Sequence, residues 1–449
     1  MNNIGIILVA RTNSKRLPRK ALLELKGKPT IVHLVERLKH SEYPVIACIP
    51  TGEQDDELAS VLVATGIEVF RGDPDNPLKR MVDCNEKYKY EHIIRVTHDD
   101  LLIDLKIMNL MVRYYLKQNL DYTYTALIPE GCGCEIYKGS ALKQAYEDNK
   151  NYNIEGVSNY FRNESYNWDQ YITNYEYQYP FRVTMDTDRD FILIKALAEQ
   201  LPKPFSRLYA LDIIHHLKNY PALRDINRTS LVTIYIPNYN YSAYLDDAIQ
   251  SALNQTFKDL EIIVIDDAST DISDTIIKRY IYPGSKVNVI FNETNIGLPA
   301  CANKALEYSR SKYIMRIDAD DKLMPECVEK LFNFIEAQND IGAVYAGYLE
   351  TNENLITIAE HKPPFDPNEN THHPSGALLK RRCWQDLKYD SDLVAFESYD
   401  FFKRFNKRFN IAYFNEPLWF KRTHSENMTA PKHEEKRKAE KIKVDAKND

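Results

Sequence analysis

Apolar and polar positions repeat a strand–loop–helix pattern through the first half of the chain. Residues 4–10 form a continuous apolar run, long enough for one buried strand. The segment 29–38 has apolar residues at helical spacing, which predicts a helix with one buried face. Further elements are predicted as strands over 45–49, 67–70 and 92–97 and as a helix marked by Leu58, Val61 and Leu62. This alternation predicts a parallel, doubly wound sheet with its site at the carboxyl ends of the strands.

The same pattern starts again near residue 231. The stretch 203–228 is rich in helix formers and interrupted by prolines, and we place a domain boundary at its end. The strands predicted beyond it span residues 231–236, 260–265, 287–291 and 313–317, with a helix face formed by Leu245, Ala248, Ile249 and Ala252. We therefore predict an α/β fold of two Rossmann-like, doubly wound, mostly parallel sheets in tandem. The predicted parts are domains 1–228 and 229–430 and a charged tail, 431–449.

Composition narrows the class of protein. The chain of 449 residues is 44% hydrophobic and 27% charged, values of a globular protein with a substantial core. Its formal net charge of -7, without a basic stripe of interleaved aromatics, argues against a nucleic-acid partner. The start lacks a signal-peptide pattern, and no apolar run approaches the roughly 20 residues that span a bilayer. We expect a cytoplasmic protein without a transmembrane segment, whose seven scattered cysteines are reduced thiols.

The loop after the first strand, residues 11–20, carries five cations. Arg can bind a phosphate through two parallel hydrogen bonds, and Lys acts as a point charge. Pro18 stiffens the loop, so less entropy is lost when a ligand orders it. A solvated basic turn is the alternative interpretation, but the buried strand before the loop and the acids downstream favour a phosphate site.

Two acidic segments follow in the first half. The predicted strand 92–97 ends in Thr97-His98-Asp99-Asp100, and a second group spans residues 186–190. Carboxylates that face phosphates indicate a cation between them, and oxygen ligands suit Mg²⁺. We interpret Asp188 and Asp190 as caps of a helix over 191–197 and keep Asp186 as a metal candidate.

These residues resemble the spore-coat polysaccharide cytidylyltransferase-like family, which is similar to CMP-Kdo and CMP-sialic acid synthetases. The resemblance covers roughly residues 1–225 and rests on these motifs: Ala10-Arg11-x-x-Ser14-x-Arg16-Leu17-Pro18-x-Lys20, Arg71-Gly72, Arg95-Val-Thr97-x-Asp99-x-x-Leu-Ile-Asp104 and Asp186-Thr187-x-x-Asp190. It implies Mg²⁺-dependent transfer of a nucleotidyl group from CTP to a sugar acid or phosphorylated acceptor. The implied nucleotide-binding residues are Ala10, Arg11, Ser14, Arg16, Lys20, Arg71 and Thr97, with Lys20 and Arg16 also catalytic and with Asp99 and Asp186 as metal ligands. The sequence around His98 departs from the family pattern.

Aspartates end two predicted strands of the second half as well. One strand leads into Asp266-Asp267, and another leads into Asp318-Ala-Asp320-Asp321. Strand ends of one parallel sheet converge on one edge, and acids this dense need a counter-ion. A divalent metal bound to a diphosphate is the interpretation we favour.

The second half resembles family-two inverting glycosyltransferases of the GT-A fold, from about residue 231 to 424. The motifs are Pro237-x-Tyr239-Asn240, Asn254-Gln-Thr256, Asp266-Asp267-x-Ser269-x-Asp271, Asn295-x-Gly297, Asn303, Asp318-Ala-Asp320-Asp321 and Arg422-Thr-His424. The resemblance implies nucleotide contacts from Pro237, Tyr239, Asp267, Asn295, Gly297, Asp318 and Arg422, and Mn²⁺ or Mg²⁺ at Asp318, Asp320 and His424. A basic surface turn is the alternative for residues 422–424. The pair His372-His373 is too short to indicate a metal site.

The position of the catalytic base departs from the family pattern. The resembling family places an Asp in a stretch close to Glu-Asp-Tyr-Asp, whereas this chain has Ser398 there, within Glu397-Ser398-Tyr399-Asp400. A neutral hydroxyl is a poor base without an activator. We rank Glu397 first as the base, loss of transfer second and Asp400 third. A helix cap is the alternative role for Glu397.

We therefore expect a bifunctional enzyme of surface polysaccharide or capsule biosynthesis, which uses CTP and a nucleotide sugar. A homodimer and peripheral association with glycan-assembly enzymes are consistent with this interpretation. The alternative is that only the first domain is catalytic and the second is a module that binds a nucleotide sugar or glycan.

Overall fold

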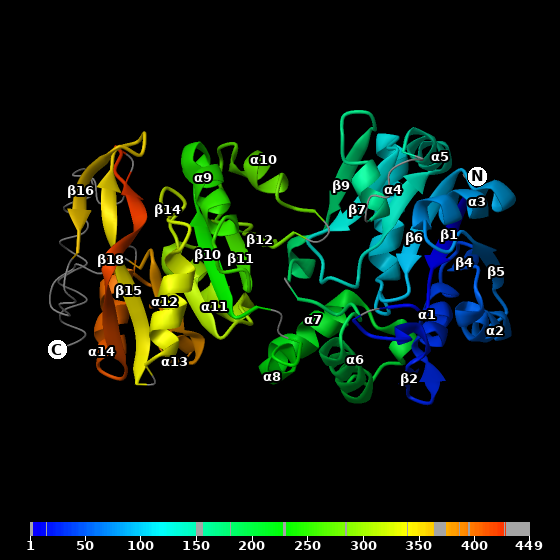
Figure 1. Ribbon diagram of the computed structural model, residues 1–449, viewed down its shortest axis with the longest axis horizontal. Helices are drawn as coiled ribbons and strands as arrows, with labels where there is room; N and C mark the ends of the chain where they lie inside the picture. Colours follow the sequence, from blue (N-terminus) through cyan, green and yellow to red (C-terminus); the bar gives the residue numbers. More distant parts are fainter. Residues whose placement is uncertain are drawn as a thin grey trace. The chain divides into compact units, whose positions relative to one another are not determined.

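The computed structural model divides into two compact units, Met1–Asn227 and Arg228–Asp449, which are described separately (Figure 1). The residues that it describes are 3–14, 16–149, 156–179, 181–227, 230–282, 285–338, 340–362, 374–385, 387–393, 396–425 and 427. Lys15, the pair His372-His373 and the predicted tail lie outside the described residues. No helix in the described part of the chain has the length and apolar character needed to cross a membrane.

The first unit contains a seven-stranded sheet in the order β5-β4-β1-β6-β8-β7-β9 and a separate two-stranded hairpin. Its strands are β1 (Ile4–Val9), β2 (Glu24–Leu25), β3 (Lys28–Pro29), β4 (Val45–Pro50), β5 (Glu68–Gly72), β6 (His92–Thr97), β7 (Tyr122–Ala126), β8 (Glu135–Lys138) and β9 (Trp168–Ile172). Its α-helices are α1 (Thr30–Leu38), α2 (Asp56–Ala64), α3 (Pro77–Tyr88), α4 (Leu105–Gln118), α5 (Gly139–Asp148), α6 (Asp188–Gln200), α7 (Ala210–Asn219) and α8 (Pro221–Arg224).

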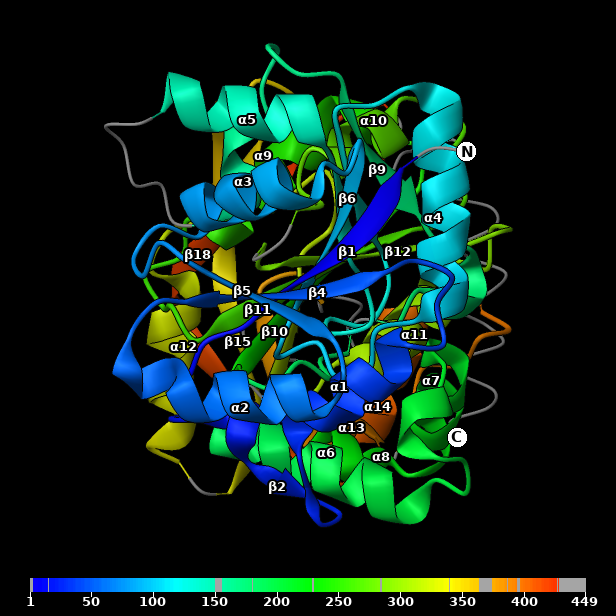
Figure 2. The same ribbon diagram turned by 90° about the vertical axis from the view of Figure 1, so that its right-hand side faces the viewer.

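The order of the first four strands brings the ends of β1 and β6 together. Both neighbours of β1 pair with it in parallel, and Val9 lies opposite Thr97. The chain moves outward from β1 to β5 through α1 and α2, which lie on one face of the sheet, and it returns to β6 through α3, on the other face (Figures 1 and 2). The loops that follow β1 and β6 therefore leave the same edge side by side, as the doubly wound pattern predicts.

The second unit is built on a nine-stranded sheet with the strand path β12-β11-β10-β13-β17-β15-β18-β14 and with β16 paired to β15. Its strands are β10 (Val232–Asn238), β11 (Leu260–Asp266), β12 (Val287–Phe291), β13 (Tyr313–Arg316), β14 (Lys322–Leu323), β15 (Ile341–Thr351), β16 (Thr357–His361), β17 (Ala377–Lys380) and β18 (Asn410–Arg422). Its helices are α9 (Ser242–Leu253), α10 (Ser273–Lys278), α11 (Leu298–Tyr308), α12 (Cys327–Glu336), α13 (Arg381–Gln385) and α14 (Glu397–Asn406).

Strands β10 to β13 form the parallel part of this sheet. Every residue of β10 and β11 is buried, as expected for strands covered on both faces. Asn238 lies opposite Asp266, so the loops after β10 and β11 leave the sheet together. The remaining strands join through antiparallel pairs and one parallel pair, β15 with β18.

The predicted α/β class with mostly parallel sheets is confirmed, and so are the strands and helices expected in the two parallel parts. Among the described residues, the segment 181–184, which precedes the second acidic group, makes an isolated bridge between Arg182 and Glu130 and is not part of a strand. Strands β8 in the first unit and β15 to β18 in the second, which join the sheets mainly through antiparallel pairs, are absent from the predicted elements.

Candidate active sites

Lys20 lies at the centre of the first site and bridges two carboxylates. Its ammonium is 2.7 Å from Asp99 Oδ2 and 2.8 Å from Asp186 Oδ1, and its side chain is only 6% exposed. Arg16 approaches the same Asp186 oxygen at 3.1 Å. The structure thus brings together the basic loop after β1, the acidic loop after β6 and the segment before α6, as the sequence predicts.

Two contacts fix the shape of the basic loop. Thr12 donates from its amide and from its hydroxyl to Asp55 Oδ1, each at 2.8 Å, and Asp55 is completely buried. At the far end of the loop, the Thr30 hydroxyl at the start of α1 donates to the Lys20 carbonyl at 2.6 Å. The loop is therefore anchored at both ends before a ligand binds, which reduces the entropy that binding costs.

A second cation, Arg182, holds Asp186 from the other side. Arg182 Nη2 lies 2.6 Å from Asp186 Oδ2, and the same guanidinium contacts Asp190 and Glu130. Asp190 accepts hydrogen bonds from the amides of Asp186 and Thr187 and completes a capping box with Thr187 at the start of α6. Asp190 is thus a cap, as predicted, and the network orients Asp186 toward Lys20.

The charges of the site lower the pKa of both bridged acids. Burial alone would raise the pKa of Asp99, but the charges of His98 and Lys20 and the hydrogen bonds from Lys20 and Thr97 outweigh it and lower that pKa. Burial lowers the pKa of His98 to about 4, so its ring is neutral near pH 7 and Lys20 is the cation that pairs with Asp99 there. For Asp186, burial is likewise outweighed by the hydrogen bond from Lys20, and its pKa is lowered.

Asp99 and Asp186 fit a magnesium site. Asp99 Oδ1 is buried, and within the described residues it has no hydrogen-bond partner. Mg²⁺ is commonly held by one or two carboxylates together with substrate phosphates, and these two acids share one cation here. Asp100 is less suited to bind a metal ion, because burial and the charge of Asp99 raise its pKa to about 8. Its carboxyl group also accepts a hydrogen bond from the Thr97 hydroxyl at 2.6 Å.

The other implied nucleotide-binding residues of the first unit differ in burial and in their hydrogen-bond partners. Ala10 is buried at the end of β1, Ser14 is half-buried, and Arg11 is exposed. Arg71 is engaged on β5, where it bonds Asp56 and the carbonyls of Pro50 and Gly52. Asp104 caps α4 through the amides of Lys106 and Ile107 and accepts the Ala210 amide, which ties α4 to α7.

We expect Asp190→Ala to lower the free energy of unfolding of the first unit by about 2–4 kcal/mol, since it removes a buried acceptor and leaves Arg182 without that partner. Urea unfolding of the full chain measures the change. The matched control is Asp188→Ala, which removes an exposed acid from the same helix turn and should cost less than about 1 kcal/mol. Equal losses in the two variants would contradict the role assigned to Asp190.

In the second unit, Asp267 closes a loop beyond β12. Its carboxylate accepts hydrogen bonds from the Asn292 side chain at 2.7 Å and from the amides of Ile296 at 2.9 Å and Gly297 at 2.8 Å. Its oxygens thus hold the 292–297 loop, and a nucleotide contact by Asp267 remains a prediction. Tyr239 and Asn295 are exposed near these loops, and Pro237 is buried within β10.

Three aspartates gather at the end of β13. Ligand oxygens of Asp318, Asp320 and Asp321 lie within 4.8 Å of one another. Burial raises the pKa of Asp318 and of Asp321, and the charge of Asp320 raises both further. A cation bound by the three carboxylates would relieve that repulsion, so the cluster fits the divalent metal that the sequence predicts.

Residues 422–424 meet this cluster from the end of β18. His424 Nε2 lies 3.0 Å from Asp320 Oδ2, and the Arg422 amide donates to Asp321 Oδ1 at 3.1 Å. The Arg422 guanidinium packs over the Tyr244 ring, 4.6 Å from its centre, and bonds Asp247 at 2.8 Å. Both side chains are buried, so the alternative of a basic surface turn is wrong.

Glu397 and Asp400 have different surroundings on α14. Glu397 Oε1 lies 3.4 Å from Arg316 Nη1 and accepts the Ser398 hydroxyl at 2.9 Å, and the same Arg316 guanidinium bonds Asp318. Asp400 is completely buried and is paired with Arg404 at 2.7 Å. Glu397 is therefore linked to the aspartate cluster through one buried arginine.

Arg182 and Arg316 were missed by the sequence reasoning. Arg182 is half-buried and lies four positions before Asp186, and Arg316 is buried and lies two positions before Asp318. Both arginines stand next to apolar residues and before a predicted metal ligand. An arginine in such an apolar segment was a usable signal, because a buried cation requires a partner.

Comparison with known proteins gives a match for each unit. A family model described as Cytidylyltransferase matches residues 4–229, and one described as Glycosyl transferase family 2 matches residues 233–387. An uncharacterized glycosyltransferase of Methanocaldococcus jannaschii is 35% identical over 186 residues, which are 39% of this chain and 64% of that protein.

Two further comparisons concern cytidylyltransferases and spore-coat synthesis. The spore coat polysaccharide biosynthesis protein SpsF of Bacillus subtilis is 32% identical over 214 residues, 44% of this chain and 88% of its own length. The solved structure of a cytidylyltransferase from Leptospira borgpetersenii is 25% identical, with a TM-score of 0.46, and the match covers 50% of this chain and 97% of that one.

Proposed function

Because the chain belongs to the cytidylyltransferase family and its second half carries a glycosyltransferase family 2 domain, we propose that it is a bifunctional enzyme of surface glycan synthesis. The first unit transfers CMP from CTP to a sugar acid or phosphorylated acceptor. The second unit transfers a sugar, with inversion, from a nucleotide sugar. The observation that carries the proposal is the bridge from Lys20 to Asp99 and Asp186 at the end of the basic loop.

In the first unit, Lys20 and Arg16 bind the triphosphate, since both are cations at the edge where β1 and β6 end. An acceptor oxygen forms a bond to the α-phosphorus of CTP, the bond from that phosphorus to the β-phosphate oxygen breaks, and pyrophosphate leaves. Asp99 and Asp186 would hold Mg²⁺, which supplies charge neutralisation for the triphosphate.

In the second unit, Asp318, Asp320 and His424 would hold Mn²⁺ or Mg²⁺, which supplies charge stabilisation for the departing diphosphate. Glu397 accepts the proton of the acceptor hydroxyl as that oxygen attacks the sugar carbon. Its link to Asp318 through Arg316 supports this role, because it places Glu397 in the same site as the proposed metal ligands, where the acceptor hydroxyl must meet the sugar carbon.

The likeness to SpsF supports a role in polysaccharide or capsule synthesis, since that protein is named for spore coat polysaccharide biosynthesis. We also propose a cytoplasmic location, a homodimer and peripheral association with glycan-assembly enzymes. Ser398 favours one alternative, in which the second unit only binds a nucleotide sugar or glycan, because a neutral hydroxyl occupies the position of the family's base.

Melting of the full chain with a panel of nucleotides tests the two sites separately. We expect CTP with Mg²⁺ and a nucleotide sugar with Mn²⁺ each to raise the melting temperature, since ligands that bind only the folded state stabilise it. EDTA should remove both shifts.

Variants assign each shift to its unit. Lys20→Met should lose the CTP response alone, and Asp320→Ala should lose the nucleotide-sugar response alone. A CTP response that persists in Lys20→Met without loss of affinity, or that disappears in Asp320→Ala, would refute the assignment of the sites.

A further inference from the structure

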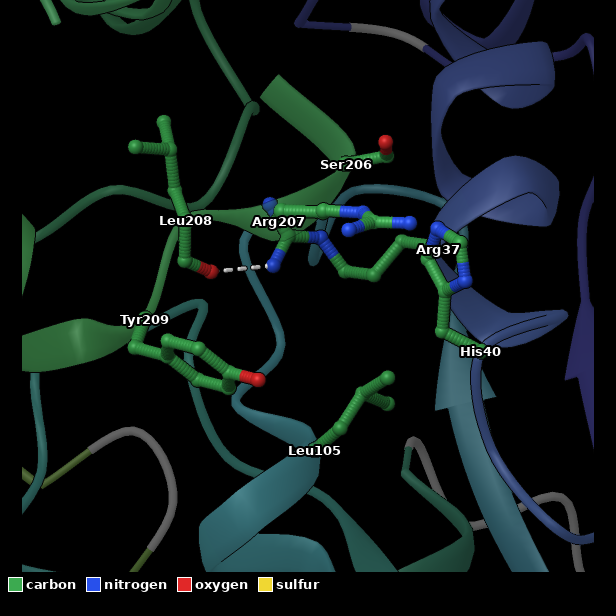
Figure 3. Close-up of a pocket in the computed structure, with 7 residues that line it drawn as sticks. All are labelled: Arg37, His40, Leu105, Ser206, Arg207, Leu208 and Tyr209. Atoms are coloured by element: carbon green, nitrogen blue, oxygen red, sulfur yellow. Dashed lines mark hydrogen bonds between the residues drawn. The ribbon is translucent and has the colours of Figure 1, made fainter. Parts of the chain in front are cut away.

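A basic pocket lies in the first unit, and its lining does not include Lys20, Asp99 or Asp186 of the first active site. Its volume is about 190 Å³, and it forms where the end of α1 meets residues 205–209 and the start of α4 (Figure 3). Its polar lining consists of Arg37, His40, Ser206, Arg207 and Tyr209. Three of these five side chains are cations or can become cations, and no lining residue is an acid.

Arg37 is a buried charge whose hydrogen bonds go to neutral groups. It is 1% exposed, and its guanidinium donates to the carbonyls of Ile103, Leu208 and Phe205. Within the described residues, its Nε is buried without a hydrogen-bond partner. Burial lowers the pKa of Arg37 to about 10, so it stays charged at pH 7. A buried cation that pairs only with carbonyls attracts an anion strongly.

The acids near the pocket are occupied elsewhere. Asp104 attracts Arg37 electrostatically, but its two oxygens accept three backbone amides, those of Lys106, Ile107 and Ala210. Asp212 accepts the Tyr209 amide and pairs with Lys203 at 2.7 Å. Neither carboxylate forms an ion pair with Arg37 among the described residues.

The rest of the lining adds to the positive potential. Arg207 and His40 are exposed, and Figure 3 shows both side chains in the lining together with Arg37, whose guanidinium points toward the Leu208 carbonyl. Helices α4 and α7 both begin at the pocket, at Leu105 and just after Tyr209. The amides of Lys106, Ile107 and Ala210 at these helix starts are already paired with Asp104, so Arg37 and Arg207 carry the positive potential of the pocket.

We propose that this pocket binds a phosphate group, as inorganic phosphate or a small phosphate monoester. Arg37 and Arg207 supply the charge-assisted hydrogen bonds, and the Ser206 and Tyr209 hydroxyls complete the polar lining. The pocket is connected to the first active site, because Arg37 holds Ile103 in the loop that carries Asp99, and α1 also bonds the Lys20 carbonyl through Thr30. An occupant would therefore stabilise both loops of that site.

The test follows the His40 imidazole signal by NMR in the full chain, labelled at histidine, with the signal identified by its absence in His40→Gln. Inorganic phosphate and glycerol 3-phosphate are titrated separately against chloride at equal ionic strength. We expect the His40 signal to shift and saturate with at least one of them, and the tighter ligand identifies the source of the phosphate group.

Arg207→Gln should weaken this response about tenfold or more, since it removes one charge-assisted contact from an exposed position. Lys39→Gln is the matched control, because Lys39 neighbours His40 without lining the pocket, and it should leave the response unchanged. If phosphate bound at a nucleotide site instead, its affinity would not change in Arg207→Gln. No shift beyond the chloride control, or the same titration in Arg207→Gln as in the native chain, would overturn the proposal.

Discussion

Asp99→Ala should abolish nucleotidyl transfer by the first unit, with kcat/KM at least about 10³-fold lower. The variant removes one of two carboxylates that share Lys20, and it removes the buried oxygen available to a metal ion. Charge stabilisation by a metal and its ligands is worth several kcal/mol, and each 1.36 kcal/mol changes the rate about tenfold.

The fold should survive this change. Lys20 keeps its contact with Asp186, and Arg182 continues to hold Asp186 from the other side. Asp188→Ala is the control, because it removes an exposed acid only two positions after Asp186. This variant should keep full activity. Near-native transfer by a folded Asp99→Ala protein would show that Asp99 is not needed for the reaction.

Glu397→Gln should lower sugar transfer by the second unit about 10²–10⁴-fold, the usual contribution of a general base. The amide keeps the size of the side chain and can still accept the Ser398 hydroxyl, but it cannot take a proton from the acceptor. Transfer and donor hydrolysis are both assayed with the nucleotide sugar that stabilises the chain.

Asp400→Asn is the matched comparison on the same helix. Asp400 is fully buried against Arg404, which also bonds the carbonyls of Leu387 and Lys388. Breaking this pair should reduce the free energy of unfolding by about 3 kcal/mol, while the protein that remains folded transfers at the native rate.

Ser398→Asp completes the set, because it restores an acid at the position of the family's base. Undiminished transfer by Glu397→Gln would exclude Glu397 as the base. Transfer by Ser398→Asp alone, with none by the native chain, would favour the alternative in which the second unit is a binding module.

The apolar pattern was sufficient for the parallel core of each unit. Runs such as 4–10 and 260–265 identify buried strands without reference to distant residues, and adjacent strand ends follow from the doubly wound order. For this reason the sequence predicts that the basic loop and Asp99 lie at the same edge of the sheet, where Lys20 of that loop contacts Asp99 in the structure.

The added strands could not be found in the same way. β8 and β17 are four residues each, and their partners are set by long-range pairing rather than by local periodicity. Polar partners are equally non-local: Asp267 bonds residues 25 to 30 positions away, and Arg316 bonds Glu397, 81 positions away. Nothing in the sequence around Asp267 indicates that its oxygens would close a loop.

Release of pyrophosphate tests the central claim most directly. The full chain is incubated with Mg²⁺, a panel of sugar acids and phosphorylated acceptors, and one of CTP, UTP, ATP or GTP at equal concentration. We predict acceptor-dependent release from CTP above all others, with none from Asp99→Ala. Preference for another triphosphate, or equal release by Asp99→Ala, would contradict the account.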